Sequence, residues 1–239
     1  MRIDVLRDAD AVAQAAAAII AAHARAAVRS GASFVLAVSG GRTPWQMLRA
    51  LAREQVPWQG THVVQVDERV APLRHADRNL TVLRENLLAL VPLRAEQVHA
   101  MPVESMDLDA AAANYGQELS EIAGSPPVLD LVHLGLGPDG HTASLVPGDP
   151  VLDVANADVA LTGLYQGRRR MTLTYPILNR SRHILWVVTG GEKAHMLARL
   201  LDGDPSIPAG RLNRTEARIL ADCAAAGQPD SAPVTEVSP

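Results

Sequence analysis

The sequence predicts an α/β fold in which helices cover both faces of a mostly parallel sheet. Three short apolar runs, at residues 33–38, 129–134 and 184–188, have the continuous hydrophobic pattern of strands buried on both faces. Longer segments with helical signals separate them, and strands that alternate with helices at this spacing form parallel sheets.

Glycines, prolines and capping residues set the predicted element boundaries. Gly31 ends a long helix over residues 9–29. Thr43 as N-cap and Pro44 in the first turn open the next helix. Further helices are predicted at 79–90, 108–122 and 192–201, and further strands at 62–66, near Val98, and at 159–164 and 171–174 as a hairpin.

Length and composition predict one domain. The chain has 239 residues, 48% of them hydrophobic, which suffices for a large core. Neither an internal repeat nor a long linker divides it, so a single α/β domain is predicted over residues 1–226. Residues 227–239 hold prolines and small polar residues, which predicts a disordered tail.

Charge and cysteine content exclude several classes of function. A net charge of −4 gives no basic field for nucleic acid, so an anionic substrate would be held by a few placed cations. Cys223 is the single cysteine, which excludes an intrachain disulfide and a multi-cysteine metal site. The apolar run at residues 15–22 is far shorter than the roughly 20 residues of a membrane span, and no basic segment precedes it. A cytoplasmic protein without a membrane segment is therefore expected.

A glycine-rich loop follows the first buried run, with the sequence Ser39-Gly40-Gly41-Arg42-Thr43-Pro44. Glycines allow close approach to a ligand, and the N–H groups of a helix start favour phosphate, although an ordinary turn is the alternative. Ser39 also lies one residue away from a nucleophile-elbow pattern. A serine hydrolase is less favoured, because Thr43-Pro44 places the helix start several residues after the serine.

A second glycine-rich loop, at residues 135–144, carries Asp139 and His141. It satisfies the dinucleotide fingerprint formally, but Pro147 and Pro150 prevent the long helix that this fingerprint requires. His141 is suited to accept a proton near neutral pH, and Asp139 could orient its ring. No His-x-x-x-His or Glu-His spacing completes a metal site, so no metal is expected.

Charged residues follow other predicted strands. Asp67-Glu68-Arg69 comes directly after the strand at 62–66 and is either a structural ion pair or part of a site. Arg170 precedes another strand, and Lys193 is the only lysine in the chain. A lysine at a helix N-terminus opposes the helix dipole unless an anion binds there, which favours a phosphate ligand.

The combination of these motifs, in this order, resembles the 6-phosphogluconolactonases. The resemblance extends over about residues 1–226 and includes the segments at 170–174, 190–194, 207–209 and 222–225. The wider superfamily also holds glucosamine-6-phosphate deaminases and sugar-phosphate sensors. Thr142, Ala143 and Ser144 follow His141 as in the lactonases, whereas the deaminases resemble Asp-Gly-His-Ile-Ala-Phe-Asn.

The resemblance implies a three-layer α/β sandwich similar to glucosamine-6-phosphate deaminase and ribose-5-phosphate isomerase. It also implies hydrolysis of 6-phosphogluconolactone in the oxidative pentose phosphate pathway without a metal or organic cofactor. By the family pattern His141 is the catalytic base, and Asp67, Arg69 and Asp139 line the sugar and the reacting carbonyl. The phosphate ligands implied by the same pattern are Ser39, Gly40, Gly41, Arg42, Thr43, Arg170 and Lys193.

Two residues depart from the family pattern, and several points stay open. Arg42 and Arg78 stand where the family often has serine. The oxyanion donor is either Arg69 or loop amides near Gly137. A deaminase-like isomerase and a non-catalytic sugar-phosphate-sensing domain are the alternative functions. The expected partner is a small phosphorylated sugar lactone, with no nucleic acid and no membrane, and the expected state is a monomer or small homo-oligomer.

Overall fold

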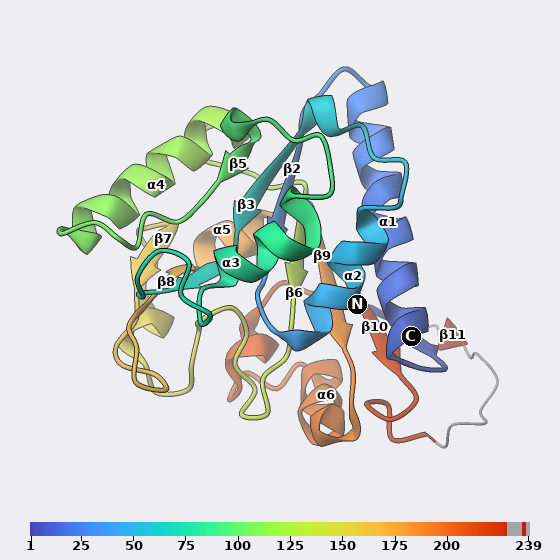
Figure 1. The fold of residues 1–239 in the computed structure, drawn as a ribbon. Coiled ribbons are helices and arrows are strands. Elements are labelled where there is room, and N and C mark those ends of the chain that lie inside the picture. Colours follow the sequence, from blue (N-terminus) through green and yellow to red (C-terminus); the bar gives the residue numbers. More distant parts are fainter. Residues whose placement is uncertain (229–235, 238–239) are drawn as a thin grey trace.

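A largely parallel sheet forms the centre of the fold (Figure 1). The computed structural model describes residues 1–228 and 236–237, and only the backbone of residues 42, 43, 236 and 237. Within these residues the sheet has eight strands in the order β11-β1-β10-β9-β6-β2-β3-β5. The strands are β1 (Arg2–Leu6), β2 (Phe34–Val38), β3 (Thr61–Gln65), β5 (Val98–His99), β6 (Leu131–Leu134), β9 (His183–Val188), β10 (Ala217–Asp222) and β11 (Glu236–Val237). Every neighbouring pair is parallel except β1 and β11.

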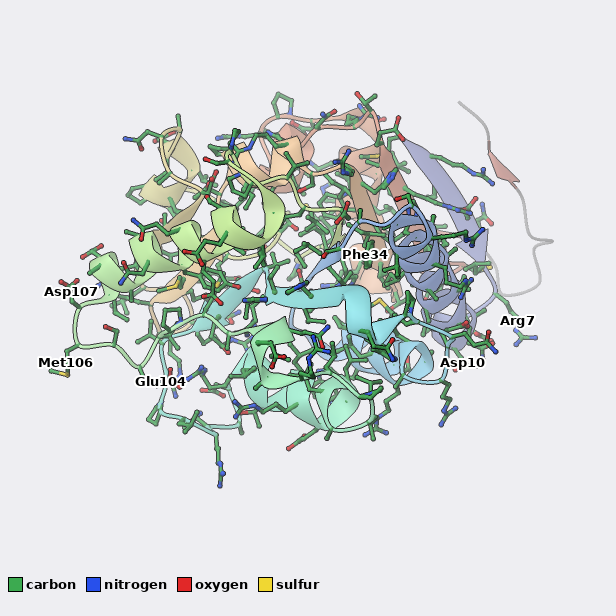
Figure 2. All side chains as sticks on the ribbon, turned by 90° about the horizontal axis from the view of Figure 1, so that it is seen from above. Arg7, Asp10, Phe34, Glu104, Met106 and Asp107 are labelled. Carbon is green, nitrogen blue, oxygen red and sulfur yellow. The ribbon has the colours of Figure 1, made fainter. Side chains whose placement is uncertain are left out.

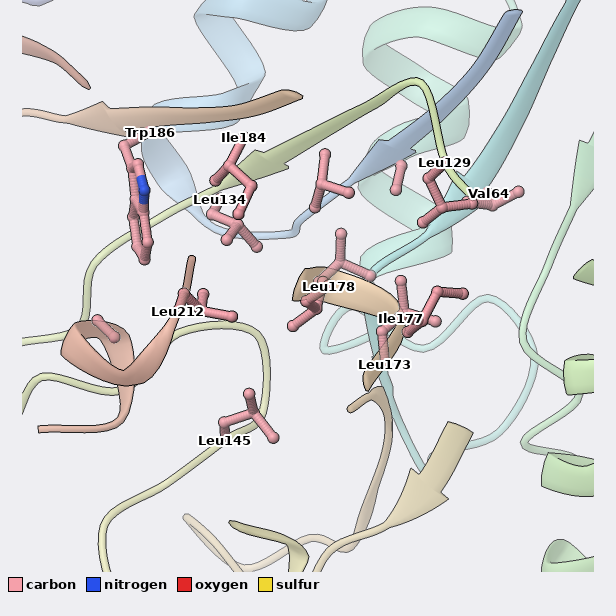
Figure 3. Close-up of a cluster of buried hydrophobic side chains, with 14 of the residues drawn as sticks. Val64, Leu129, Leu134, Leu145, Leu173, Ile177, Leu178, Ile184, Trp186 and Leu212 are labelled. Carbon is pink, nitrogen blue, oxygen red and sulfur yellow. The ribbon is translucent and has the colours of Figure 1, made fainter. Parts of the chain in front are cut away.

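Both faces of the sheet are buried, because successive side chains of each central strand enter two different hydrophobic clusters. In β9, Ile184 and Trp186 belong to one cluster, and Leu185 and Val187 belong to the other. Figure 3 shows Ile184 and Trp186 on the side of the sheet that also holds Ile177. The continuous apolar runs in the sequence have this physical origin.

Helices cover the two faces as separate layers. Three helices contribute to the cluster on one face: α1 (Ala9–Arg29), α2 (Arg42–Leu51) and α3 (Asn79–Leu83), the last continued by a π-helical turn at Arg84–Leu88. The other face holds α4 (Leu108–Ala123), α5 (Tyr175–Arg180) and α6 (Ala194–Asp202). Seen from above, Arg7 and Asp10 at the start of α1 lie at the opposite edge of the molecule from Asp107, which begins α4 (Figure 2). The predicted three-layer α/β sandwich is confirmed.

A small antiparallel sheet extends the second layer below α4. Its order is β4-β8-β7, with β4 at Asp67–Arg69, β7 at Val159–Leu161 and β8 at Arg170–Leu173. The predicted hairpin is therefore confirmed. Short 3-10 turns complete the secondary structure at Trp58–Gly60, Ala95–Gln97, Pro150–Asp153, Gly191–Lys193 and Pro208–Arg211.

Some predicted boundaries differ from the structure. The prediction of Thr43 as the N-cap of α2 was wrong. Gly41 is the N-cap, because its φ of 117° breaks the helical conformation and the helix covers Arg42–Leu51. Gly31, with φ of 83°, ends α1 as predicted. Strands β1 and β10 and helix α5 were not predicted from the sequence patterns.

Helix α1 has the length and composition of a membrane-spanning helix. Its apolar face nevertheless packs in the core, where Val12, Ala16, Ile20 and Ala24 are fully buried. A core helix passes the same test of length and composition, so this feature gives no sign of a membrane protein.

The predicted disordered tail lies largely outside the described residues. Gly227 and Gln228 close a turn, with the N–H of Gln228 donating to the carbonyl of Cys223 at 2.8 Å. Glu236–Val237 pairs with β1 as an antiparallel strand.

The strand order places a topological switch point between β2 and β6. From β2 the chain adds β3 and β5 on one side, and from β6 it adds β9 and β10 on the other. Loops leaving the carboxyl ends of two such strands diverge, and the crevice between them is where open α/β sheets bind ligands. In Figure 1 the loops that follow β2, β6 and β9 gather at the lower end of the sheet.

Candidate active site

A cavity of about 290 Å³ lies at this switch point. The ends and following loops of β2, β6 and β9, the small sheet and the start of α3 line it with Ser39, Gly40, Gly41, Pro44, Asp67, Arg69, Asn79, Gly135, Leu136, Gly137, Pro138, His141, Ala143, Arg170, Val187, Val188, Thr189, Glu192 and Lys193. Eight of the eleven predicted site residues are therefore lining residues. Asp139 lies against His141 without lining the cavity, and the side chains of Arg42 and Thr43 are outside the described part of the chain.

His141 and Asp139 form a hydrogen-bonded pair at the cavity wall. Nδ1 of His141 lies 2.5 Å from Oδ1 of Asp139, and the same oxygen accepts the His141 backbone N–H at 3.2 Å. Burial acts to raise the pKa of Asp139, but the charge of the His141 ring and its hydrogen bonds outweigh burial and hold this pKa below its ordinary value. An ionised Asp139 fixes the proton of His141 on Nδ1, so Nε2 is left to accept a proton.

The loop that carries this pair is a tight turn and not the start of a helix. The Gly137 N–H donates to the His141 carbonyl at 2.8 Å, and the Gly140 N–H donates to the Gly137 carbonyl at 3.1 Å. Thr142 and Leu145 form an isolated bridge directly afterwards. This geometry agrees with the rejection of a dinucleotide-binding loop.

Asp67 is the buried acid of the site. Its Oδ2 accepts the Ser144 hydroxyl at 2.6 Å, its Oδ1 accepts the Asn79 amide at 3.1 Å, and Arg170 lies 4.0 Å away. Burial raises the pKa of Asp67, while the Ser144 hydrogen bond and the Arg170 charge oppose this rise.

Arg69 is held at the cavity wall by the segment that leads into α3. Its Nη1 donates to the Asp77 carbonyl at 2.6 Å and to Oδ1 of Asn79 at 3.3 Å. A guanidinium has five N–H donors, so these two bonds leave others that can contact a ligand.

Glu68 and Arg78 form a buried pair behind the site. Nε of Arg78 lies 3.0 Å from Glu68, and Arg78 also reaches the Ala71 carbonyl and Glu104. Oε1 of Glu68 accepts the backbone N–H groups of Arg69 and Asn79. Both side chains are almost fully buried, so this pair orders the segment between β4 and α3 and does not face the cavity.

Ser39 is not arranged as a nucleophile. Its hydroxyl donates to the His133 carbonyl at 2.9 Å, and its N–H points at Nδ1 of His133 at 3.3 Å. Burial lowers the pKa of His133 to about 4, so this ring is neutral. Because the ring accepts an amide and not the serine hydroxyl, the serine-hydrolase interpretation gains no support.

The first glycine loop joins the start of α2 to the cavity. Gly41 has no side chain that could cap the helix, so the N–H groups of the first turn are available to an anion. A Cβ on Gly40 would lie 2.0 Å from Oδ1 of Asn79, so only glycine permits this contact.

Cations outnumber carboxylates among the described side chains that line the cavity. The lining cations are Arg69, Arg170 and Lys193, and the lining carboxylates are Asp67 and Glu192. The Arg170 guanidinium is buried, which lowers its pKa, and its Nη2 donates to Gln166 at 3.1 Å. Its buried Nε has no hydrogen-bond partner in the described part of the chain. This surplus of positive charge is suited to an anionic ligand.

The structure adds two residues that the sequence patterns did not indicate. Asn79 bridges Asp67 and Arg69, and the Tyr165 hydroxyl donates to Asp139 at 3.2 Å. Neither belongs to a recognisable motif, since both depend on contacts between segments distant in sequence. No group of three or more His, Cys, Asp or Glu among the described residues could hold a metal ion.

The fold and cavity define an α/β protein suited to general-base chemistry on a small anionic molecule. The chain belongs to the family of glucosamine-6-phosphate isomerases/6-phosphogluconolactonase, whose sequence model matches residues 7–221. It is 34% identical over 210 residues to the 6-phosphogluconolactonase of Synechocystis sp., covering 85% of this chain and 87% of that protein. It is 35% identical over 240 residues to the 6-phosphogluconolactonase of Mycobacterium tuberculosis, covering 95% and 97%.

Solved structures agree with this assignment. The 6-phosphogluconolactonase of Thermotoga maritima superimposes with a TM-score of 0.81 at 26% identity and covers 92% of this chain and 98% of its own. A monomeric glucosamine-6-phosphate deaminase has a TM-score of 0.84 at 20% identity over 96% of this chain and 100% of its own. The latter likeness concerns the fold alone and confirms the predicted similarity to the deaminases.

Proposed function

We propose that this protein is a 6-phosphogluconolactonase, which hydrolyses 6-phosphoglucono-1,5-lactone to 6-phosphogluconate in the oxidative pentose phosphate pathway. The observation that carries the proposal is His141, with Nδ1 held by Asp139, at the wall of a cavity lined by three cations. The names of relatives that match most of the chain support the same reaction.

In the proposed mechanism, Nε2 of His141 takes a proton from water while the water oxygen attacks C1 of the lactone. The tetrahedral intermediate then breaks the bond between C1 and the ring oxygen. The His141 imidazolium returns its proton to that oxygen, which becomes the 5-hydroxyl of the product. General-base assistance of this kind contributes on the order of 10²–10⁴-fold.

Arg69 is the favoured donor to the oxyanion of the intermediate. The alternative, an amide of the His141 loop, has little support, because the N–H groups of Gly137, Gly140 and His141 already have acceptors within the loop. Pro138 has no N–H. The Arg69 guanidinium lines the cavity and retains donors.

The phosphate subsite is expected at lining residues outside the His141 loop. The amides of Gly40 and Gly41 at the start of α2 and the cations of Arg170 and Lys193 supply the donors. Ser39 contributes by fixing the loop to β6 through His133. Roles for Arg42 and Thr43 stay predictions, as do a cytoplasmic location and a monomeric or small homo-oligomeric state.

The test of the function is direct. Purified protein is given freshly made 6-phosphogluconolactone, and acid release is followed against the uncatalysed rate. We expect clear acceleration and no ammonia from glucosamine-6-phosphate. Release of ammonia without lactone hydrolysis would instead support the deaminase-like isomerase, and binding without either reaction would support the sensor.

Gly137→Ala is expected to lower kcat about a hundredfold, because a misplacement of about 1 Å at a catalytic group can cost this much. A Cβ at this position would lie 2.1 Å from Nδ1 and 2.3 Å from Cε1 of His141, so the ring must move. Gly116→Ala is the control, since Gly116 lies in α4, does not line the cavity, and its Cβ would meet only Cγ2 of Val159, at 3.9 Å. Equal kcat values for both variants would show that the observed ring position is not required.

A further inference from the structure

The connection between β7 and β8 ends in a two-residue hairpin turn that reaches the site. Tyr165 and Arg168 form a bridge in which each N–H donates to the other's carbonyl, at 3.0 and 3.2 Å. The two residues between them, Gln166 and Gly167, have φ of 51° and 77°. Positive φ at both central positions is the feature of a type I′ turn, which matches the twist of the flanking strands.

The hairpin tip is fixed on its outer side as well. Nε of Arg168 lies 2.8 Å from Asp77, whose carbonyl accepts Arg69. Gln166 accepts Nη2 of Arg170. The backbone position of Tyr165 is therefore set by the turn and by the contacts that Arg168 and Gln166 make with Asp77 and Arg170.

Tyr165 contacts two parts of the site with two parts of its side chain. Its hydroxyl donates to Oδ2 of Asp139 at 3.2 Å and lies 3.5 Å from Nδ1 of His141, while Oδ1 of Asp139 faces the same nitrogen. Its ring packs against the Arg170 guanidinium, whose Cζ lies 4.8 Å from the ring centroid. Neither Tyr165 nor Asp139 is among the residues that line the cavity.

We propose that Tyr165 is a positioning residue. Its hydroxyl holds Asp139 in the orientation that Asp139 needs to hydrogen-bond His141, and its ring holds the Arg170 guanidinium in position to bind the substrate anion. The proposal rests on the lactonase function proposed above. One side chain then sets the geometry of the proton-accepting pair and of a phosphate-binding cation without touching substrate.

The hydroxyl has a defined electrostatic effect. A donor on Oδ2 draws negative charge away from the carboxylate, so less remains to stabilise a protonated His141 ring. Removal of the hydroxyl should therefore raise the pH at which His141 takes up its proton. It should also loosen Asp139, because one of its two oxygens loses its side-chain donor.

Other charges around His141 stay the same in such a variant. The charged and titratable groups at the pair and the cavity wall are Asp139, Tyr165, Arg170, Asp67, Arg69, Glu192 and Lys193. Only the hydroxyl of Tyr165 changes when tyrosine becomes phenylalanine, so a shift in the His141 titration reports the loss of its contacts with Asp139 at 3.2 Å and with Nδ1 of His141 at 3.5 Å.

The test compares Tyr165→Phe with Tyr165→Leu. For Tyr165→Phe we expect the acid limb of kcat/KM to move up by about half a pH unit and kcat to fall by about tenfold or more, the size of one lost hydrogen bond to a charged group. KM should stay the same, because the ring on Arg170 remains. Tyr165→Leu should show the same pH shift and, in addition, a KM raised roughly threefold by loss of the cation–π contact. An unchanged acid limb in the phenylalanine variant, or an unchanged KM in the leucine variant, would overturn the corresponding half of the proposal.

Tyr115→Phe is the matched control. It removes another tyrosine hydroxyl, which donates to the His99 carbonyl at 2.9 Å and has no contact with Asp139. We expect a loss of stability and no movement of the acid limb. A shift equal to that of Tyr165→Phe would show a general effect of losing a hydroxyl and would overturn the proposal.

An NMR titration of labelled histidine separates this proposal from the proposed function, because it needs no substrate. A His141 titration that moves upward in Tyr165→Phe supports the hydroxyl bond even if wild type fails to hydrolyse the lactone, which would refute the function alone. An active wild type whose His141 titration is unaltered by Tyr165→Phe refutes the role of Tyr165 and leaves the function standing.

Discussion

His141→Ala is expected to lower kcat for 6-phosphogluconolactone hydrolysis by about 10²–10⁴-fold, the range of general-base assistance. Binding of the product 6-phosphogluconate should change little, since the phosphate subsite lies on other loops. Stopped assays against the uncatalysed rate, with product binding by calorimetry, measure the two effects separately. Loss of kcat with intact product binding identifies a group that acts in the chemical step.

A histidine far from the cavity gives the control for this substitution. His62 lies near the amino end of β3, where its Nδ1 contacts His99 at 3.0 Å. His62→Ala should retain wild-type kcat. If His141→Ala hydrolysed the lactone within a few-fold of wild type, water would be activated by another group, and Asp67 would become the next candidate.

The pH dependence of the wild type follows from the same pair. The folded-state pKa of Asp139 is lowered, so its charge persists below the ordinary carboxylate pKa, while the stability it contributes is complete above that ordinary pKa and is lost progressively as pH falls from it through the lowered value. Asp139 therefore stays ionised beside the His141 ring, which must be neutral to accept a proton.

Strands buried on both faces could be predicted from the sequence, but strands with charged residues could not. β1 and β10 lie side by side, and Asp4 of β1 pairs with Arg218 of β10 at 2.5 Å and with Arg2 at 3.1 Å. These ion pairs satisfy charges that interrupt the apolar pattern of each strand. The pairing joins residues more than two hundred positions apart, so no local window can reveal it.

In the site, too, some residues could be predicted from the sequence and others could not. Ser39, His141 and Lys193 could be placed because each follows a recognisable strand, and the carboxyl ends of parallel strands meet at one edge. Tyr165 could not be placed, because its role depends on a turn that brings residue 165 against residue 139. Arg78 departs from the family pattern, and the structure accounts for it by the buried pair with Glu68.

Arg170→Met is expected to lower kcat/KM for the phosphorylated lactone by roughly 10²–10³-fold, because truncation of one member of a buried charge pair costs about 2–5 kcal/mol in binding. Arg170 is 5% exposed, and its buried Nε has no hydrogen-bond partner among the described residues. A buried donor without a partner is expected where an anionic ligand binds. Methionine keeps most of the volume of the stem and removes the charge.

The decisive comparison is with unphosphorylated gluconolactone. If Arg170 binds the phosphate, the variant should hydrolyse gluconolactone within about threefold of wild type, because that substrate never used the interaction. Arg169→Met is the control, since Arg169 is exposed and its Nε donates to the Thr162 carbonyl at 3.3 Å.

Should both substrates lose activity equally in Arg170→Met, the cation would act on the chemical step instead. Its neighbours Asp67, 4.0 Å away, and Tyr165 provide the physical route for that outcome, because both connect Arg170 to groups around the reacting carbonyl. The ratio of the two substrates' kcat/KM values therefore distinguishes a phosphate ligand from a cation that supports the catalytic pair.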